Sequence, residues 1–221
     1  IKIPGTQEGL PAIEEAIYSG VSVNVTLLFS SQHCRDAADA YMKGLERRVA
    51  EGLSPDVRSV ASVFVSRWDK AVIEKVPAEL KDKLGIAVST QAYRDYRDML
   101  DSDRWQQLQS MGARPQRLLF ASTSTKDPSA PDTLYVEALA APNTVNTTPD
   151  KTLLAFGDHG KLSSVLSRDG GDCEDMLATF EKAGISIPGL AAQLQQEGAA
   201  SFAKSWEDLL QSIETKSKAL G

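Results

Sequence analysis

The order of hydrophobic and polar positions at the start of the chain predicts a β-strand, a helix and a second β-strand. Ile1–Pro4 and Val21–Phe29 are short and rich in β-branched residues, which is typical of strands. Between them, apolar side chains recur at helical spacing in Leu10–Ser19, and Gly20 ends that pattern. A strand, a helix and a strand in this order form a βαβ unit, whose parallel strands are normally buried on both faces.

Polar residues interrupt both predicted strands. Lys2 stands between two isoleucines in the first strand. Ser22, Asn24 and Thr26 alternate with apolar residues in the second strand, so their side chains share one face. Polar groups that face a protein interior are costly unless they are paired or used, and a desolvated lysine amine becomes a nucleophile for carbonyl carbon. The alternative interpretation is that Lys2 is a solvated residue at a ragged chain start.

The rest of the chain continues to alternate between strand and helix patterns. The further predicted strands are Val57–Val65, Arg117–Thr123 and Thr144–Thr148. The further predicted helices are one from Ser30 or Ser31 to about Glu51, Ile86–Leu100 with a continuation over Asp101–Gln109, Tyr135–Leu139, one that begins at Pro149, Asp172–Ala183, Pro188–Gln196 and Ala199–Leu220. Trp68–Gly85 and Gly157–Gly171 are expected to be loops, the first with a short helix. The last helix carries an apolar stripe that is expected to bury against the rest of the molecule: Phe202, Trp206, Leu209, Leu210 and Ile213.

Composition describes one ordinary globular domain. The 221 residues are 42% hydrophobic and 24% charged, which is enough length for a sizeable core, and we find no domain boundary. The net charge of −6 without a basic cluster argues against a nucleic-acid-binding surface. No apolar run approaches the ~20 residues of a membrane span, and the start of the chain has no signal-peptide pattern. We therefore expect neither nucleic acid nor a membrane as a partner.

The cysteines and histidines predict no disulfide framework and no metal site. Cys34 and Cys173 lie far apart and outside any C-x-x-C motif, and His33 and His159 are equally isolated. This cysteine usage favours a reducing compartment, with the cytoplasm as the default. Cys34 lies in the first turn of a predicted helix, where an exposed thiol would be oxidisable, but a packing role is favoured.

Several motifs resemble the transaldolase family. IKIPGT at the start of the chain and GVSVNVTLLFS from Gly20 are similar to that family's lysine strand and to the strand after it. Ser62, Phe64 and Arg67 match its S-x-F-x-x-R motif, and P-N-T-V-N-T from Pro142 matches its last strand. The resemblance covers most of the chain, and its motifs are long and specific.

The resemblance implies an α/β fold, the (β/α)8 TIM-type barrel. A complete barrel typically needs about 250 residues, and only about five βα units can be counted here. In the family the lysine strand is the fourth of eight. We therefore expect residues 1–221 to form a single domain with the fourth to eighth βα units and C-terminal helices from about residue 172. The family's proton-transferring aspartate and glutamate, on the first and third strands, have no counterpart in this sequence.

The catalytic residues follow from the resemblance alone. In the family, the lysine of the I-K-I strand forms a covalent Schiff base with the ketose substrate, which implies that Lys2 is the nucleophile. Asn24 would hold a hydroxyl of the covalent intermediate, and Thr26 would position the water that is used to make and break the imine. No metal and no organic cofactor is implied, because the iminium itself accepts the electrons.

The resemblance also implies a substrate-binding set: Ser62, Phe64, Arg67, Ser124 and Lys126. Ser62, Arg67 and Lys126 would hold the substrate phosphate, because barrel active sites lie at the carboxyl ends of the strands. Arginine binds phosphate bidentately, whereas lysine, which stands here where the family often has arginine, keeps only the charge. Without the resemblance, Arg67 would be interpreted as a surface ion pair with Asp69, and Lys126 as an exposed loop lysine beside Asp127.

The implied function is that of a transaldolase, which moves a three-carbon dihydroxyacetone unit between sugar phosphates in the pentose phosphate pathway. The implied substrates are fructose 6-phosphate, sedoheptulose 7-phosphate, erythrose 4-phosphate and glyceraldehyde 3-phosphate. Two alternatives stay open. In the first, the chain acts as a Schiff-base aldolase that releases the three-carbon unit without transfer. In the second, it is a catalytically incomplete barrel fragment that needs its N-terminal part. The sequence predicts no oligomeric state.

Overall fold

Five parallel strands form one sheet whose order follows the chain, β1-β2-β3-β4-β5. The computed structural model describes residues 1–220. The strands are β1 Lys2–Pro4, β2 Val23–Leu28, β3 Ser59–Phe64, β4 Arg117–Ala121 and β5 Val145–Asn146. The helices are α1 Gly9–Tyr18, α2 Ser31–Ala50, α3 Ser66–Val72, the 3-10 turn η1 Ala78–Leu80, α4 Leu84–Asp101, α5 Asp103–Ser110, α6 Leu134–Ala138, α7 Asp150–His159, α8 Cys173–Lys182 and α9 Ile187–Leu220.

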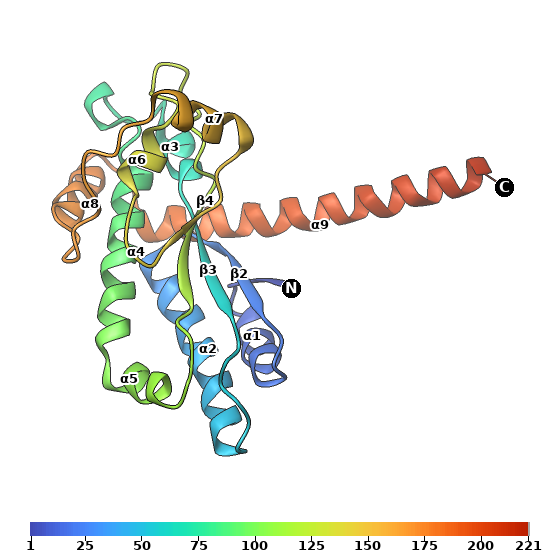
Figure 1. The fold of residues 1–221 in the computed structure, drawn as a ribbon. Coiled ribbons are helices and arrows are strands. Elements are labelled where there is room, and N and C mark those ends of the chain that lie inside the picture. Colours follow the sequence, from blue (N-terminus) through green and yellow to red (C-terminus); the bar gives the residue numbers. More distant parts are fainter. Residues whose placement is uncertain (221) are drawn as a thin grey trace.

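Helices α1, α2 and α4 pack against one face of the sheet (Figure 1). Each connection between neighbouring strands contains a helix, as parallel pairing requires, because the chain must return to the same end of the sheet. A parallel sheet whose strand order follows the chain, with helices between the strands, is the arrangement of consecutive units of a barrel. The predicted fold class, a TIM-type barrel with about five units in this chain, is therefore confirmed.

Side chains alternate along each strand between the helix-covered face and the opposite face. Val25, Val63 and Phe120 are fully buried between the sheet and the helices, where each large apolar side chain contributes about 1.5–3 kcal/mol. Asn24 and Ser62 each precede one of these residues. Their side chains therefore belong to the opposite face of the sheet, which is the interior side of a barrel.

A serine begins α2, and a glycine within α2 allows it to pack closely on α1. Of the two serines at which this helix was expected to start, Ser30 caps α2, because its Oγ accepts the N–H of His33 at 3.0 Å. A Cβ atom at Gly44 would lie only 2.7 Å from the carbonyl oxygen of Glu14 and 2.8 Å from Cβ of Ile17. Gly44 therefore permits a separation between α1 and α2 that a larger residue would prevent.

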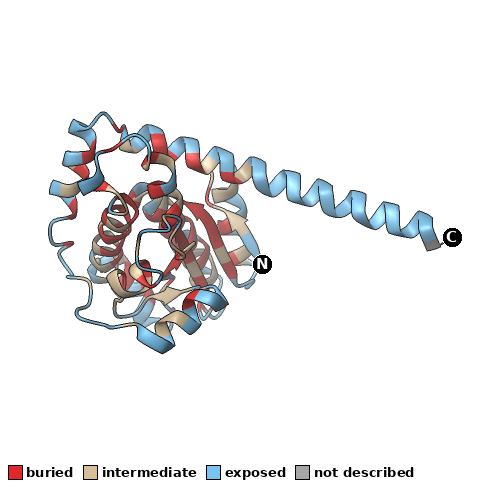
Figure 2. Cartoon of the chain, turned by 90° about the horizontal axis from the view of Figure 1, so that it is seen from above, coloured by how far each residue is buried: buried red, intermediate tan, exposed pale blue. Residues whose placement is uncertain are grey.

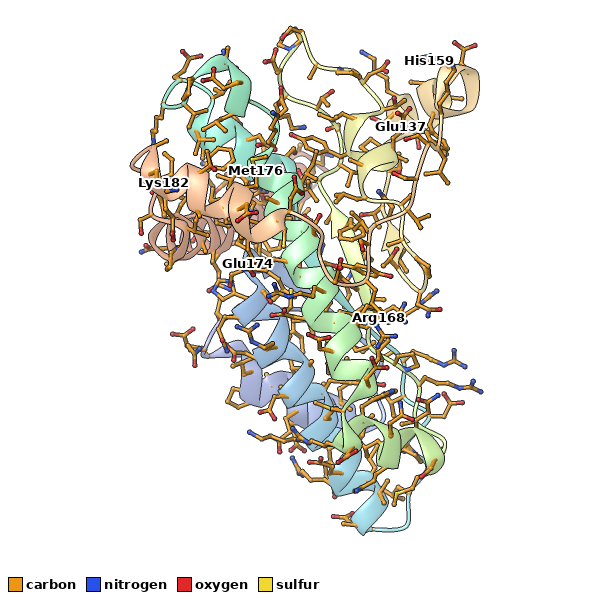
Figure 3. All side chains as sticks on the ribbon, turned by 90° about the vertical axis from the view of Figure 1, so that its left-hand side faces the viewer. Glu137, His159, Arg168, Glu174, Met176 and Lys182 are labelled. Atoms are coloured by element: carbon orange, nitrogen blue, oxygen red, sulfur yellow. The ribbon has the colours of Figure 1, made fainter. Side chains whose placement is uncertain are left out.

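Helix α8 lies against α4, and polar contacts join the two (Figure 3). The carboxylate of Glu174 accepts hydrogen bonds from Arg94 Nη1 at 2.6 Å and from Gln91 Nε2 at 3.0 Å. Glu174 is more than half exposed, so this ion pair contributes little stability. The buried Leu177 and Phe180 on the same helix provide the larger attachment.

The segment Trp68–Gly85, expected to be a loop with a short helix, does contain a short helix, α3, which already begins at Ser66. Helix α3 starts directly after β3, and Trp68 and Val72 are 0% and 1% exposed. These two residues are one helical turn apart, so a helix buries both on the same side. The loop predicted from Gly157–Gly171 likewise begins later, because α7 extends to His159.

The two predicted helices Pro188–Gln196 and Ala199–Leu220 form one helix, α9, which crosses the molecule and then projects away from it (Figures 1 and 2). The apolar stripe that was expected to bury is exposed, from 38% at Phe202 to 61% at Trp206. That expectation is wrong for the whole stripe, which also includes Leu209, Leu210 and Ile213. The reason is geometric: α9 passes the edge strand β1 and meets no further element among residues 1–220 against which to pack.

Local interactions support the projecting part of α9. Lys204 and Asp208 are 3.7 Å apart, and Lys218 and Glu214 are 2.5 Å apart, each pair one helical turn from each other. Such exposed pairs contribute about 0.3–0.5 kcal/mol each. None of the helices described within residues 1–220 is long and apolar enough to cross a membrane.

The two thiols are free and buried, which agrees with the packing role favoured for Cys34. Burial raises the pKa of Cys34 to about 12 and also raises the pKa of Cys173. Because thiolates are the reactive form, we expect neither cysteine to react with iodoacetamide at pH 8 in the folded protein. Mass spectrometry should detect no adduct until guanidinium unfolds the chain, when both cysteines should be alkylated. Rapid labelling of Cys34 without unfolding would contradict this burial.

Candidate active site

Three residues of the predicted site meet on the inner face of the sheet. Lys2 on β1 and Asn24 on β2 are partners in the parallel register. The hydroxyl of Ser62 on β3 donates a hydrogen bond of 2.7 Å to Asn24 Oδ1. The structure thus places Lys2, Asn24 and Ser62 on three neighbouring strands, with Lys2 beside Asn24 in the register and Ser62 hydrogen-bonded to Asn24.

Lys2 is exposed, so the expectation that it is buried is wrong for this structure. The reason is that β1 is the edge strand of the described sheet, with β2 on one side of it. The Nζ atom of Lys2 lies 5.7 Å from the centroid of the Phe202 ring on α9. This distance is within the range of a cation–π interaction, so α9 supplies an aromatic neighbour to the amine.

Thr26 has a different environment from Lys2. It is fully buried, and its Oγ1 has no hydrogen-bond partner among the residues that the structure describes. A buried hydroxyl without a partner costs roughly 1–3 kcal/mol, so such groups are uncommon outside functional sites. Its backbone is well held, because the N–H of Gly5 donates to the carbonyl oxygen of Thr26 at 2.8 Å. Thr26 therefore offers a fixed and unused hydroxyl one strand away from β1.

Arg67 lies in the first turn of α3, just past the carboxyl end of β3. Its guanidinium carbon is 5.0 Å from the centroid of the Phe64 ring, so the two side chains stack. The alternative ion pair with Asp69 does not form. Asp69 is 2% exposed and instead accepts the N–H of Leu84 at 2.9 Å and the hydroxyl of Tyr135 at 2.8 Å. Arg67 is half-buried, and its guanidinium lies over the aromatic ring of Phe64.

Lys126 and Ser124 lie together in the loop between β4 and α6. Lys126 is exposed, and its Nζ donates to Ser124 Oγ at 2.6 Å. This loop starts beside α3, because the N–H of Ser66 donates to the carbonyl oxygen of Ser122 at 3.0 Å. Among residues 1–220, no hydrogen bond links Lys126 to the Lys2, Asn24 and Ser62 group. The predicted set therefore falls into two parts, one on the inner sheet face and one at the carboxyl ends of β3 and β4.

Two residues that sequence reasoning missed hold α9 over the ends of β1 and β2. The amide of Gln195 donates to the carbonyl oxygens of Gly5 at 3.1 Å and Leu27 at 3.0 Å. A Cβ atom at Gly198 would lie 2.7 Å from Leu27 Cδ2 and 3.5 Å from an Arg67 guanidinium nitrogen. The glycine in the gap between the two predicted helices was the available signal, because a glycine that interrupts a helical pattern often has a packing reason. No comparable signal marked Gln195.

The backbone of Leu27 is strained beside this contact. Its φ is 59°, in the left-handed region that branched residues rarely adopt, and the register between β2 and β3 shifts between Val25 and Leu28. This irregularity turns the carbonyl of Leu27 toward Gln195. A strained residue held by its surroundings at the carboxyl end of a strand is typical of functional sites.

Asp69 is expected to make stability depend on pH. Burial raises the pKa of Asp69 to about 6, against its hydrogen bonds, which act in the opposite direction. In the unfolded chain the group ionises near pH 4, so between about pH 4 and pH 6 the folded state binds more protons. Stability is then lost as pH rises through this window, by about 3 kcal/mol. Asp69→Asn should remove this loss.

Urea unfolding at pH 4, 5, 6 and 7 measures the effect as the difference between wild type and Asp69→Asn. Other carboxylates titrate in both proteins and cancel in this difference. The free energy of unfolding of Asp69→Asn should rise relative to that of wild type as the pH rises. A difference that stays constant from pH 4 to pH 7 would mean that Asp69 has the same pKa in the folded and the unfolded state.

Comparisons with known sequences agree with this geometry. Residues 1–213 match the sequence model of the family described as Transaldolase/Fructose-6-phosphate aldolase. The chain is 44% identical to the transaldolase of Saccharopolyspora erythraea over 96% of this chain and 60% of that protein. It is 45% identical to the transaldolase of Thermobifida fusca over 96% of this chain and 60% of that protein. It is 43% identical to transaldolase 1 of Streptomyces avermitilis over 100% of this chain and 61% of that protein.

The chain spans about 60% of the length of these curated relatives. The family match nevertheless extends over all five strands and most of α9. The chain therefore belongs to the transaldolase/fructose-6-phosphate aldolase family.

Proposed function

We propose that the protein is a transaldolase in which Lys2 is the Schiff-base nucleophile. The observation that carries the proposal is the cluster of Lys2, Asn24 and Ser62 on one face of a parallel sheet. Family membership and the names of the relatives support the same activity. In this proposal the five strands correspond to the fourth to eighth strands of a (β/α)8 barrel in a single domain, with C-terminal helices from about residue 172.

The reaction begins when the neutral amine of Lys2 attacks the C2 carbonyl carbon of fructose 6-phosphate. Loss of water from the resulting carbinolamine gives an iminium. The C4 hydroxyl then gives its proton to a water molecule, the C3–C4 bond breaks, and the electron pair passes into the iminium to give an enamine. Glyceraldehyde 3-phosphate leaves at this step, and a three-carbon unit stays on Lys2.

Transfer reverses these bond changes on a second sugar. The enamine carbon attacks the aldehyde of erythrose 4-phosphate, the new alkoxide takes up a proton, and water hydrolyses the iminium to release sedoheptulose 7-phosphate. Asn24, whose Oδ1 is already bonded to Ser62, would use its amide to hold a hydroxyl of the covalent intermediate. Thr26 would position the water, since its buried Oγ1 has no other partner within residues 1–220.

The phosphate would bind at the carboxyl ends of β3 and β4. Arg67 supplies a planar donor that suits bidentate phosphate binding, and Lys126 adds a second positive charge from the neighbouring loop. Ser62, Ser124 and Phe64 complete the proposed substrate-binding set. Binding energy from this remote group helps to orient the reacting carbons.

The proposed setting is the pentose phosphate pathway in the cytoplasm. Two free cysteines support a reducing compartment, because secreted proteins usually pair their thiols. The proposed partners are the four sugar phosphates named above, with no nucleic acid and no membrane.

A second candidate is a Schiff-base aldolase that releases the three-carbon unit. The matched family is described by both activities, transaldolase and fructose-6-phosphate aldolase, which supports the aldolase as a second candidate. The two functions differ in their dependence on an acceptor. A transaldolase should turn over fructose 6-phosphate rapidly only when erythrose 4-phosphate is present, whereas an aldolase should release dihydroxyacetone without it.

Borohydride trapping tests the proposal directly. The folded protein is incubated with fructose 6-phosphate and sodium borohydride, and peptide mass mapping then locates the reduced adduct. We expect a three-carbon or hexose phosphate increment on the peptide that contains Lys2, and none when borohydride is omitted. An adduct on a different lysine would refute Lys2 as nucleophile. No adduct from a protein that is folded by circular dichroism would mean that this chain lacks a competent site.

A further inference from the structure

The loop between β4 and α6 is attached to α3 at both of its ends. At its start, the side-chain oxygens of Ser66 and Ser122 lie 2.8 Å apart, next to the backbone bond between the same residues. At its end, the hydroxyl of Tyr135 donates to Asp69 Oδ2 at 2.8 Å. We call these contacts the serine clasp and the tyrosine clasp.

The clasps enclose both proposed phosphate ligands. Arg67 stands between Ser66 and Asp69 in α3, and Lys126 stands in the loop between its two attachment points. Ser66 and Tyr135 are 0% exposed and Asp69 is 2% exposed, so water competes little for these hydrogen bonds. Neither clasp touches the inner face of the sheet around Lys2.

Asp69 ties the tyrosine clasp to a third element. Its Oδ1 accepts the N–H of Leu84 at 2.9 Å, and its carboxylate also accepts the N–H of Gly85 at 3.2 and 3.3 Å. A Cβ atom at Gly85 would lie 2.7 Å from Asp69 Oδ2. The start of α4 therefore packs directly on the carboxylate, which fixes the position of α3, and Oδ2 accepts from both Gly85 and Tyr135.

We propose that Tyr135 and Asp69 are positioning residues that hold Arg67 and Lys126 at one phosphate monoester. The proposal rests on the proposed function, because it takes Arg67 and Lys126 as the phosphate ligands. Two cations at one phosphate repel each other before it binds, so the proposal requires that the segments carrying them are held together. The clasps meet that requirement before binding, and binding then needs less ordering of the loop.

Tyr135→Phe tests the proposal, because it removes one hydroxyl and keeps the ring that packs in the core. Titration calorimetry with inorganic phosphate should give a dissociation constant about fivefold higher than for wild type, since a hydrogen bond to a charged group is lost. With fructose 6-phosphate, the KM should rise while kcat changes little. A role in overall stability alone would instead reduce the active fraction and leave the KM unchanged.

Tyr41→Phe is a matched control at the opposite end of the sheet. Tyr41 is 1% exposed, and its hydroxyl lies 2.8 and 2.6 Å from the carbonyl oxygens of Val57 and Arg114. Loss of this hydroxyl should destabilise the fold at least as much as Tyr135→Phe does. Its phosphate affinity should nevertheless equal that of wild type.

A further variant keeps the test decisive. Ser66→Ala removes the serine clasp and should weaken phosphate binding in the same direction as Tyr135→Phe. If Tyr135→Phe does not fold, the phosphate affinity of Ser66→Ala tests the proposal in its place.

The outcomes separate this proposal from the proposed function. Phosphate affinity that is unchanged in Tyr135→Phe, or reduced equally in Tyr41→Phe, overturns the clasp even if Lys2 forms its adduct. A wild-type protein that does not bind phosphate also overturns it. Affinity that depends on Tyr135 without a Lys2 adduct would support the clasp and refute the Schiff-base chemistry.

Discussion

Lys2→Met should abolish the borohydride adduct and reduce the transfer rate by on the order of 10⁴- to 10⁶-fold, the loss seen when a covalent nucleophile is removed. Lys2 is exposed on the edge strand, so the substitution removes no buried contact, and the free energy of unfolding should change by less than about 0.5 kcal/mol. Loss of activity can then be attributed to chemistry. Peptide mass mapping after trapping and urea unfolding measure the two effects.

Lys70→Met provides a matched control for this substitution. Lys70 is also an exposed lysine, and it lies on α3 three residues after Arg67 in the printed sequence. Its replacement should leave the adduct and the transfer rate at the wild-type level. If Lys2→Met still formed the adduct, or if both variants lost it equally, Lys2 would not be the nucleophile.

Arg67→Leu should raise the KM for fructose 6-phosphate by about 100-fold, because hydrogen bonds to charged groups are worth about 1.5–3 kcal/mol each relative to their loss. Adduct formation with dihydroxyacetone, which has no phosphate, should be little affected. Arg67→Lys should recover part of the affinity, since it restores the charge but not the planar pair of donors. Initial rates over a range of substrate concentrations, with both substrates, measure these differences.

Arg58→Leu is the control for Arg67→Leu. Arg58 is a mostly exposed arginine that pairs with Asp56 at the other end of β3. The Arg58→Leu substitution should leave the KM for fructose 6-phosphate unchanged. An equal rise in the KM for both arginine variants would indicate a general electrostatic effect of the net charge instead of a phosphate site beside Phe64.

The regular alternation of elements was available from the sequence because it depends on local pattern. Alternating residues in Val21–Phe29 predicted β2, and Ser30 or Ser31 was predicted as the start of α2. The same alternation predicted that Asn24 shares a face with Thr26. Periodicity does not require knowledge of the neighbours, so these predictions hold in the structure with small changes at the ends.

The surroundings of individual side chains could not be predicted from the local sequence pattern. The pattern around Lys2 allowed either a buried or a solvated lysine, and the structure decides for the second because β1 is the edge strand of the described sheet. The stripe from Phe202 predicts a buried face, but α9 projects beyond the sheet. Amphipathic spacing indicates which side chains would be buried together, whereas burial also needs an element to pack against.

The sequence by itself determined the order of strands and helices, the family resemblance and the residues of the candidate site. Only the tertiary structure decided that Asp69 pairs with Tyr135 and the start of α4 instead of Arg67, and that Gln195 fastens α9 to the ends of β1 and β2. The contact of Asp69 with Tyr135 and the contacts of Gln195 with Leu27 and Gly5 join residues that are 66, 168 and 190 positions apart. Hydrogen bonds over such separations depend on how whole elements pack, and no local periodicity records that packing.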